Sequence, residues 1–189
     1  GTGALTGSLK GGLGSASLVL DNGATVAALV ATNPIGNVTT PNDRHFWAAP
    51  FEIDAEFGGV GTDPASGLGR DLSSRKLAAF QERANTTIAI VATDMVMDKA
   101  QCQRVAIASH DGIGRAIVPA HMPGDGDAVF ALSTGEIEMQ DPDFDLMRIG
   151  HAAALCLSRS IARAVFEATS APNDLLPCWG NLNTAKDTS

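Results

Sequence analysis

The chain changes character at residues 85–89, where a charged helical pattern gives way to an apolar, β-branched run. Upstream, residues 73–84 intersperse apolar and charged side chains at helical spacing, which predicts an amphipathic helix. Downstream, residues 86–94 have the composition of a strand. Asn85 and Thr86 form the junction, and a small hydroxyl residue that opens a core strand is a candidate nucleophile. Freed by cleavage of its own peptide bond, a Thr amine titrates near pH ~7.7–8.0 and can act as the base for its own hydroxyl.

The local residues leave two plainer interpretations of this junction open. Asn85-Thr86-Thr87 is also a formal glycosylation sequon, and a threonine-rich strand start is usually only a strand start. Strand alternation points Thr86 and Thr87 to opposite faces, so a site on one face can use only one of the two hydroxyls. We take Thr86 as the candidate nucleophile and Thr87 as a structural residue.

Six motifs, of which the junction is the fourth, occur in a fixed order. They are residues 7–17, residues 46–52, residues 56–59, residues 85–88, residues 109–112 with 115–117, and residues 124–131. This ordered set resembles the DmpA-type self-cleaving peptidases, which include L-aminopeptidase/D-esterases, β-peptidyl aminopeptidases and the 6-aminohexanoate-oligomer (nylon oligomer) hydrolase. The resemblance runs from residue 1 to about residue 169, and the Asn-Thr-Thr and Asp-Gly-Asp motifs look closest to the nylon oligomer hydrolase branch.

The resemblance implies roles for four residues around the junction. Thr86 would attack the carbonyl of Asn85 to cut the chain, and would then attack substrate amides as an N-terminal residue. Asp125 and Asp127 would assist the nucleophile. Residues two apart at a strand entrance can face the same side, where one acid can hold a proton shared with the other. From the residues alone, Asp-Gly-Asp is also typical of a solvated turn.

Two further residues complete the implied site. Lys10 lies in a glycine-rich loop and matches the family's lysine, whose charge would lower the pKa of the amine or hydroxyl of the nucleophile. Asn33 ends a strand before Pro34, and the family places at this point an amide that can donate to a developing oxyanion. Without the resemblance, a solvent-facing lysine and a strand-ending asparagine explain the same two residues.

The order of the expected elements predicts an α+β fold. Strands are expected at residues 15–20, 25–32, 86–94 and 127–133, and helices at residues 73–84, 98–117 and 144–168, with Asp98 as a candidate N-cap. Pro and Gly mark residues 34–72 as a long irregular segment, and the tail from residue 170 is expected to be loose. The order suggests an antiparallel sheet covered by helices. The resemblance sharpens this to an αββα sandwich, two stacked sheets between helix layers.

Composition argues against several classes of function. The formal charge of −8 and the scattered basic residues disfavour a nucleic-acid partner. No apolar run approaches the ~20 residues that span a bilayer. No His, Cys or Asp group has ligand spacing, so we expect no metal, and we expect no other cofactor. The histidines do not predict a Ser/His/Asp triad, since no Gly-x-Ser-x-Gly elbow is present. Free thiols in a reducing compartment are the simplest interpretation of the three cysteines, which are Cys102, Cys156 and Cys178.

The whole chain, residues 1–189, is interpreted as a single catalytic domain. Because it begins Gly-Thr-Gly without an initiator Met, we expect an N-terminal segment upstream of it. Self-cleavage would end the α-part at residue 85 and leave residues 86–189 as the β-part. The cytoplasm is the expected compartment, with the periplasm as the alternative. The resemblance further implies a homo-oligomer, specifically a tetramer.

The predicted function is an autoprocessing N-terminal-threonine amide hydrolase that works through an acyl-enzyme on Thr86. Its substrates would be short peptides, aminoacyl amides or ω-amino-acid oligomers. Two alternatives stay open. One is a non-catalytic binding or assembly protein that kept the fold and lost the chemistry. The other is an acyltransferase similar to the ornithine acetyltransferases, which share the threonine nucleophile.

Overall fold

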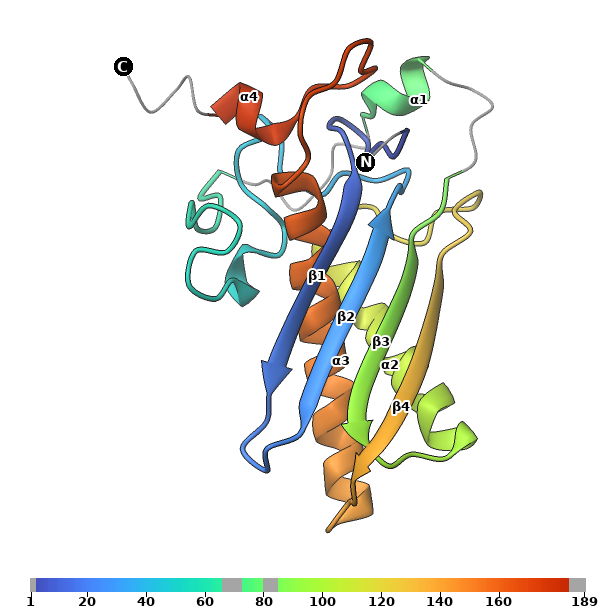
Figure 1. Ribbon diagram of the computed structural model, residues 1–189. Helices are drawn as coiled ribbons and strands as arrows, with labels where there is room; N and C mark the ends of the chain where they lie inside the picture. The colour runs from blue at the N-terminus through green and yellow to red at the C-terminus, as the bar shows by residue number, and fades with distance from the viewer. Residues whose placement is uncertain (1–2, 66–72, 80–84, 184–189) are drawn as a thin grey trace.

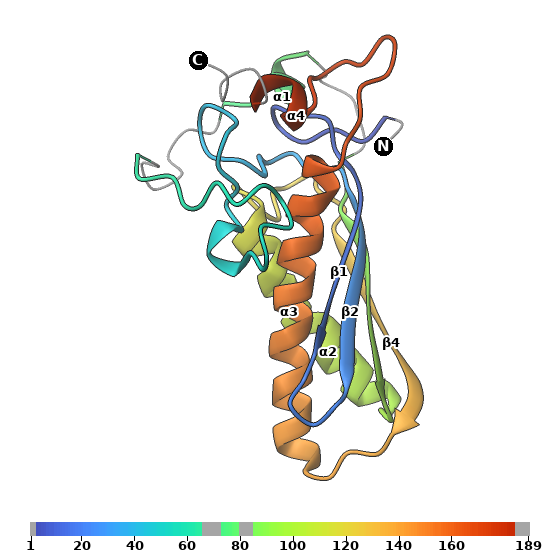
Figure 2. The same ribbon diagram turned by 60° about the vertical axis from the view of Figure 1, so that its left-hand side comes forward.

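A mixed four-stranded sheet carries two long helices on one face (Figures 1 and 2). The structure is a computed structural model, and it describes residues 3–65, 73–79 and 85–183. The sheet runs in the order β1 (Gly12–Val19), β2 (Thr25–Thr32), β3 (Ile88–Met95) and β4 (Ala128–Ile137). The covering helices are α2 (Lys99–Ala116) and α3 (Pro142–Phe166), and the short helices are η1 (Ala49–Phe51), α1 (Arg75–Ala79) and α4 (Trp179–Asn183).

The sheet is antiparallel only in part. Strands β1, β2 and β3 pair antiparallel, and the β1–β2 hairpin turns at residues 21–23 as its Asp-Asn-Gly sequence predicts. Strand β4 pairs parallel to β3, so the expectation of a wholly antiparallel sheet is wrong for this pair. The cause is α2, which carries the chain back between the two strands, and such a crossover makes them parallel. The starts of β3 and β4 therefore lie side by side at one end of the sheet.

The two covering helices begin at capping residues. Asp98 caps α2 as predicted: its side chain accepts the N–H of Gln101, whose side chain in turn accepts the N–H of Asp98. Helix α3 starts after Asp141, whose carboxylate accepts the N–H of Phe144. Of the helix expected at residues 73–84, the structure shows α1, and residues 80–84 lie outside the described part.

The core lies between the sheet and α3, and glycines allow close contact there. A Cβ on Gly14 of β1 would lie 2.1 Å from the carbonyl oxygen of Ser160, and one on Gly112 of α2 would lie 2.4 Å from that of Ala154. Only glycine permits backbone approaches this close. Fully buried side chains fill the layer, among them Val26, Val30, Val91, Ile149, Leu157 and Ile161. None of the helices in the described part is long and apolar enough to cross a membrane.

The opposite face of the sheet is open and apolar. Leu29, Ile90 and Phe130 point outward from β2, β3 and β4, and Phe130 is 60% exposed. The described residues form a single sheet, so they supply one of the two sheets expected in the sandwich. Apolar side chains on both faces are typical of a strand that is covered on both sides.

The irregular segment and the C-terminal segment pack on each other. Residues 34–65 contain only η1 and isolated bridges, as predicted for the described part of this stretch. The expected loose tail is wrong as far as residue 183. Trp179 is buried, its ring contacts Phe46 and Phe166, and its Nε1–H donates to the carbonyl of Arg44. The aromatic ring gives this proline-containing segment an apolar anchor, which its polar composition conceals.

Candidate active site

The peptide bond between Asn85 and Thr86 is held from both sides at the start of β3. The N–H of Gly126 donates to the carbonyl oxygen of Asn85 at 2.8 Å. On the other side, the N–H of Thr86 donates to the carbonyl oxygen of Asn33 at 3.0 Å. Hydrogen bonds to both its oxygen and its nitrogen fix the plane of this peptide group. A donor on the carbonyl oxygen is also what a tetrahedral oxyanion at this carbon would need.

The hydroxyl of Thr86 lies against the same carbonyl group. Its Oγ1 donates to the carbonyl oxygen of Asn85 at 2.5 Å. A Cβ on Gly126 would lie only 2.8 Å from this Oγ1, so the absence of a side chain there leaves room for the hydroxyl. Thr87 is fully buried beneath the sheet, whereas Ile88 is exposed on the open face. Strand alternation therefore places Thr86 on the open face and Thr87 on the helix face.

Asp127 holds the backbone directly after Thr86. Its side chain is 5% exposed, and its Oδ1 accepts the N–H of Thr87 at 2.9 Å. Its Oδ2 lies 2.9 Å from Nδ1 of His121, a loop residue for which the sequence predicts no role. The N–H of Ala128 returns to the carbonyl of Thr87 at 3.0 Å. The loop before β4 is thereby tied to the residue that follows the candidate nucleophile.

Asp125 is held by backbone donors from two loops. Its carboxylate accepts the N–H of Ile35 at 3.0 Å and that of Met122 at 3.3 Å. Burial raises the pKa of Asp125, the hydrogen bond from Ile35 opposes the rise, and the negative charge of Asp127 adds to it. Asp125 and Asp127 thus interact electrostatically, and Asp125 is the carboxyl that holds a proton more tightly than usual.

Asn33 and Lys76 bring a buried positive charge to the site. The ammonium of Lys76 donates to the carbonyl oxygens of Leu5, Asn33 and Pro34 and to Oδ1 of Asn33, at 2.8 to 3.1 Å. The carbonyl oxygen of Asn33 therefore accepts from both Lys76 and Thr86. The side-chain oxygen of Asn33 also accepts the N–H of Leu5. Its oxyanion role stays a prediction, and Lys76 is a site residue for which the sequence gives no signal.

Lys10 makes its contacts with the C-terminal segment. Its ammonium forms an ion pair with Asp174 at 2.8 Å and donates to the carbonyl of Thr169 at 2.9 Å. The hydrogen bond from Lys10 lowers the pKa of Asp174. Within the described residues, the ammonium of Lys10 has no hydrogen bond to Thr86, Asp125 or Asp127. Its electrostatic role on the nucleophile stays a prediction.

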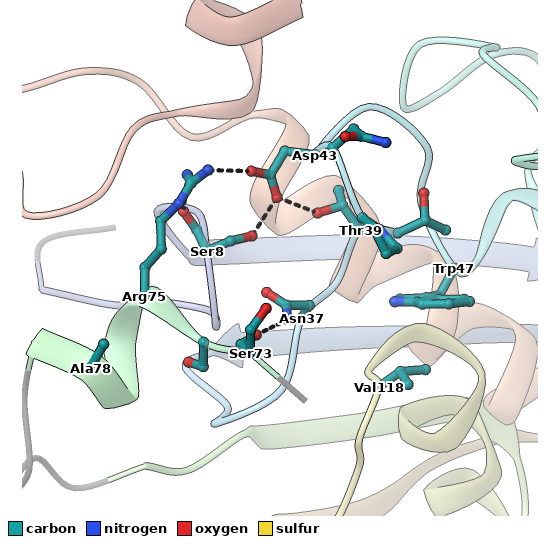
Figure 3. A pocket seen from close by; sticks show the side chains of 13 residues that line it. Ser8, Asn37, Thr39, Asp43, Trp47, Ser73, Arg75, Ala78 and Val118 are labelled. Atoms are coloured by element: carbon teal, nitrogen blue, oxygen red, sulfur yellow. Dashed lines mark hydrogen bonds and ion pairs between the residues drawn. The ribbon is translucent and has the colours of Figure 1, made fainter. Parts of the chain in front are cut away.

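A polar cavity of about 500 Å³ lies beside α1 (Figure 3). Asp43 lines it, and its carboxylate accepts the hydroxyls of Ser8 at 2.5 Å and Thr39 at 3.1 Å. Arg75 of α1 pairs with the same carboxylate at 3.2 Å. Because three donors hold it, Asp43 is suited to joining these segments. Helix α1 presents Arg75 to this cavity and the neighbouring Lys76 to Asn33.

The described residues contain no candidate metal site. No group of three or more His, Cys, Asp or Glu residues there is placed to hold a metal ion. The three cysteines are free thiols, and burial raises the pKa of Cys156 to about 11, which keeps this thiol protonated at neutral pH.

Comparison with known proteins shows which family the sequence matches. The sequence pattern of peptidase family S58 matches residues 1–174. An uncharacterized aminopeptidase of Mycobacterium tuberculosis is 41% identical over 177 residues, which are 87% of this chain and 50% of that protein. The 6-aminohexanoate-oligomer endohydrolase of Paenarthrobacter ureafaciens is 29% identical over 114 residues, 60% of this chain and 31% of that protein. The chain spans half the length or less of these relatives.

Solved structures share the fold. The PH0078 protein of Pyrococcus horikoshii superposes with a TM-score of 0.59 at 26% identity, covering 90% of this chain and 44% of that one. The L-aminopeptidase D-Ala-esterase/amidase of Ochrobactrum anthropi superposes with a TM-score of 0.60 at 23% identity, covering 93% and 46%. The latter is described as a variant of the Ntn hydrolase fold. The α+β architecture expected from the sequence is therefore confirmed, and it matches the Ntn hydrolase fold.

Proposed function

Because the chain belongs to peptidase family S58, we propose that it is a self-processing amide hydrolase whose nucleophile is Thr86. The observation that carries the proposal is the pair of hydrogen bonds to the carbonyl oxygen of the Asn85–Thr86 peptide bond. Its carbonyl oxygen accepts both the Gly126 N–H and the Thr86 hydroxyl, so nucleophile and oxyanion donor converge on one carbonyl. Neither a glycosylation sequon nor an ordinary strand start requires this arrangement.

Self-cleavage would proceed through an ester. The Oγ1 of Thr86 attacks the carbonyl carbon of Asn85, and the N–H of Gly126 donates to the oxygen as it becomes an oxyanion. The C–N bond breaks, and the Thr86 nitrogen takes up the proton that the hydroxyl has lost. Water then hydrolyses the ester between Asn85 and Thr86, which leaves a carboxylate on Asn85 and a free amine on Thr86.

In the cut protein the Thr86 amine would serve as the base for its own hydroxyl. Its nitrogen starts from a position beside Asn33, whose carbonyl oxygen also accepts the buried ammonium of Lys76. A neighbouring positive charge disfavours a protonated amine, so Lys76 would favour the neutral form of the Thr86 amine, which is the form that can accept a proton. The hydroxyl then attacks a substrate amide, the amine product leaves, and water releases the acyl group. Aminopeptidase and amino-acid oligomer hydrolase relatives suggest short peptides or amino-acid oligomers as substrates.

Intact mass of the purified protein and of Thr86→Ala tests the proposal. We expect a fragment that begins Thr-Thr-Ile-Ala in the active wild type and one uncut chain in Thr86→Ala, with Thr86→Ser still cut. Active protein that stays uncut across this bond would overturn the assignment. If added amines outcompete water for the acyl group, the acyltransferase alternative is favoured. If the protein is folded but uncut and inactive, the non-catalytic alternative is favoured.

A further inference from the structure

The contact between His121 and Asp127 links an unassigned histidine to the site. His121 lies in the loop between α2 and β4, its ring is 43% exposed, and its Nδ1 lies 2.9 Å from Oδ2 of Asp127. The Asp127 side chain is almost fully buried. A buried carboxylate requires donors for its oxygens, since a charge without partners is costly to bury. Nδ1 of His121 approaches one oxygen at ion-pair distance, and the backbone N–H of Thr87 donates to the other.

This pair of contacts forms a chain that ends at the candidate scissile bond. His121 holds Asp127, Asp127 holds the N–H of Thr87, and Thr87 is bonded directly to Thr86. Because contacts at both oxygens fix the rotation of a carboxylate, loss of His121 would let Asp127 turn away from Thr87. The Thr86 hydroxyl would then lose its alignment with the Asn85 carbonyl.

The loop backbone suits this role for His121. Its φ is +53°, in the left-handed region where His, Asn and Gly are found more often than other residues. Its ring packs on that of His110 from α2, with centroids 5.1 Å apart. Burial lowers the pKa of His110, and the charge of His121 lowers it further, while Asp127 and Asp111 oppose both effects. Asp125 is the remaining charged group of this loop that interacts with Asp127.

We propose that His121 is a positioning residue for Thr86, acting through Asp127 and the Thr87 N–H. This inference rests on the proposed function. His121 is no triad base in this arrangement, because its partner Asp127 contacts the Thr87 backbone N–H, whereas the Thr86 hydroxyl contacts the Asn85 carbonyl. Its imidazole is required as a hydrogen-bond donor to a carboxylate, which an amide at the same position can replace.

The test uses three substitutions at residue 121 in the full chain and follows the fraction of cut chain over time. His121→Gly suits the backbone conformation and removes the ring, so we expect cleavage about 10- to 100-fold slower, the scale for a misplaced reacting group. His121→Asn keeps a donor near the Nδ1 position and should cut within a few-fold of wild type. His121→Leu should be as slow as His121→Gly. His151→Asn on α3 is the matched control.

Imidazole rescue separates positioning from a merely structural role. Added imidazole should speed cleavage by His121→Gly several-fold and leave wild type unchanged. It should have no effect on His121→Gly combined with Asp127→Asn. The inference is wrong if His121→Gly melts like wild type and cuts at the wild-type rate. It is also wrong if His121→Gly is slow and imidazole does not rescue it while Asp127 is intact. The proposed function fails separately, if the wild type is active and uncut at Asn85–Thr86.

Discussion

Substitution of Gly126 by alanine tests the alignment of the Thr86 hydroxyl with the carbonyl it would attack. The new Cβ would lie 2.8 Å from Oγ1, whereas ordinary contacts begin at 3.4 Å, so the oxygen must retreat by about 0.6 Å. Gly126 does not have a left-handed backbone conformation, so alanine fits the backbone without strain. Rotation of the Thr86 side chain is the easiest relief, and it moves the hydroxyl off the Asn85 carbonyl.

A displacement of this size should act on the rate of cleavage and leave the fold intact. Misplacing a reacting group by about 1 Å can cost about 10²-fold, so we expect self-cleavage by Gly126→Ala to be about 10- to 100-fold slower. This corresponds to about 1.4 to 2.7 kcal/mol in the activation free energy. Stability should hold or rise slightly, because alanine restricts the unfolded chain more than glycine does.

The assay is the fraction of cut chain against time by intact mass, with thermal melting as the measure of folding. Gly114→Ala on α2 is the matched control, because a Cβ there meets no atom within 4 Å. It should cut at the wild-type rate. A Gly126→Ala protein that melts normally and also cuts at the wild-type rate would show that the hydroxyl does not act from this position.

Three further substitutions examine the support around the site. Thr87→Val should raise the free energy of unfolding by about 1 kcal/mol and leave cleavage unchanged, because the buried Thr87 hydroxyl has no hydrogen-bond partner in the described residues. Slower cleavage by a Thr87→Val protein that is fully folded would show that this hydroxyl takes part in the reaction. Glu56→Ala should lower the free energy of unfolding in urea by about 3 kcal/mol, because it leaves the buried guanidinium of Arg159 without its carboxylate. A loss below about 1 kcal/mol would show that the pair contributes no more than an exposed ion pair does. Asp125→Asn should remove part of the pH dependence of the free energy of unfolding. Because the folded state raises the pKa of Asp125, the stability of the wild type falls as pH rises from 3.8 through the folded pKa. Parallel profiles of stability against pH in the two proteins would contradict this.

Local sequence patterns predict most strands and helices of this fold. Strand β2 has the expected bounds, and β1 and β3 differ from expectation by a few residues at their ends, because alternation and turn residues act over short distances. The parallel β3–β4 pair and the packed segment at Trp179 depend on contacts between distant parts of the chain. A pattern within one element carries little information about such contacts, so both expectations failed.

The candidate site likewise contains residues that sequence motifs predict and residues that only the structure reveals. Thr86, Asp125 and Asp127 lie in motifs that a sequence comparison can find, and the structure places them on the adjacent segments that lead into β3 and β4. Lys76 and His121 lie in no such motif. Lys76 is 43 residues from Asn33 in sequence, and their contact depends on how α1 docks against the first strands. Only the folded arrangement identifies these two residues.

The identity of the nucleophile depends finally on strand register. A shift of β3 by one residue would exchange Thr86 and Thr87 between the two faces, because side chains alternate along a strand. Two contacts with the loop before β4 prevent this shift: the N–H of Gly126 donates to the carbonyl of Asn85, and the side chain of Asp127 accepts the N–H of Thr87. Both contacts belong to the Asp-Gly-Asp motif. The motif would therefore act first on where the chain is cut, by selecting which threonine faces the scissile carbonyl, before either aspartate takes part in proton transfer.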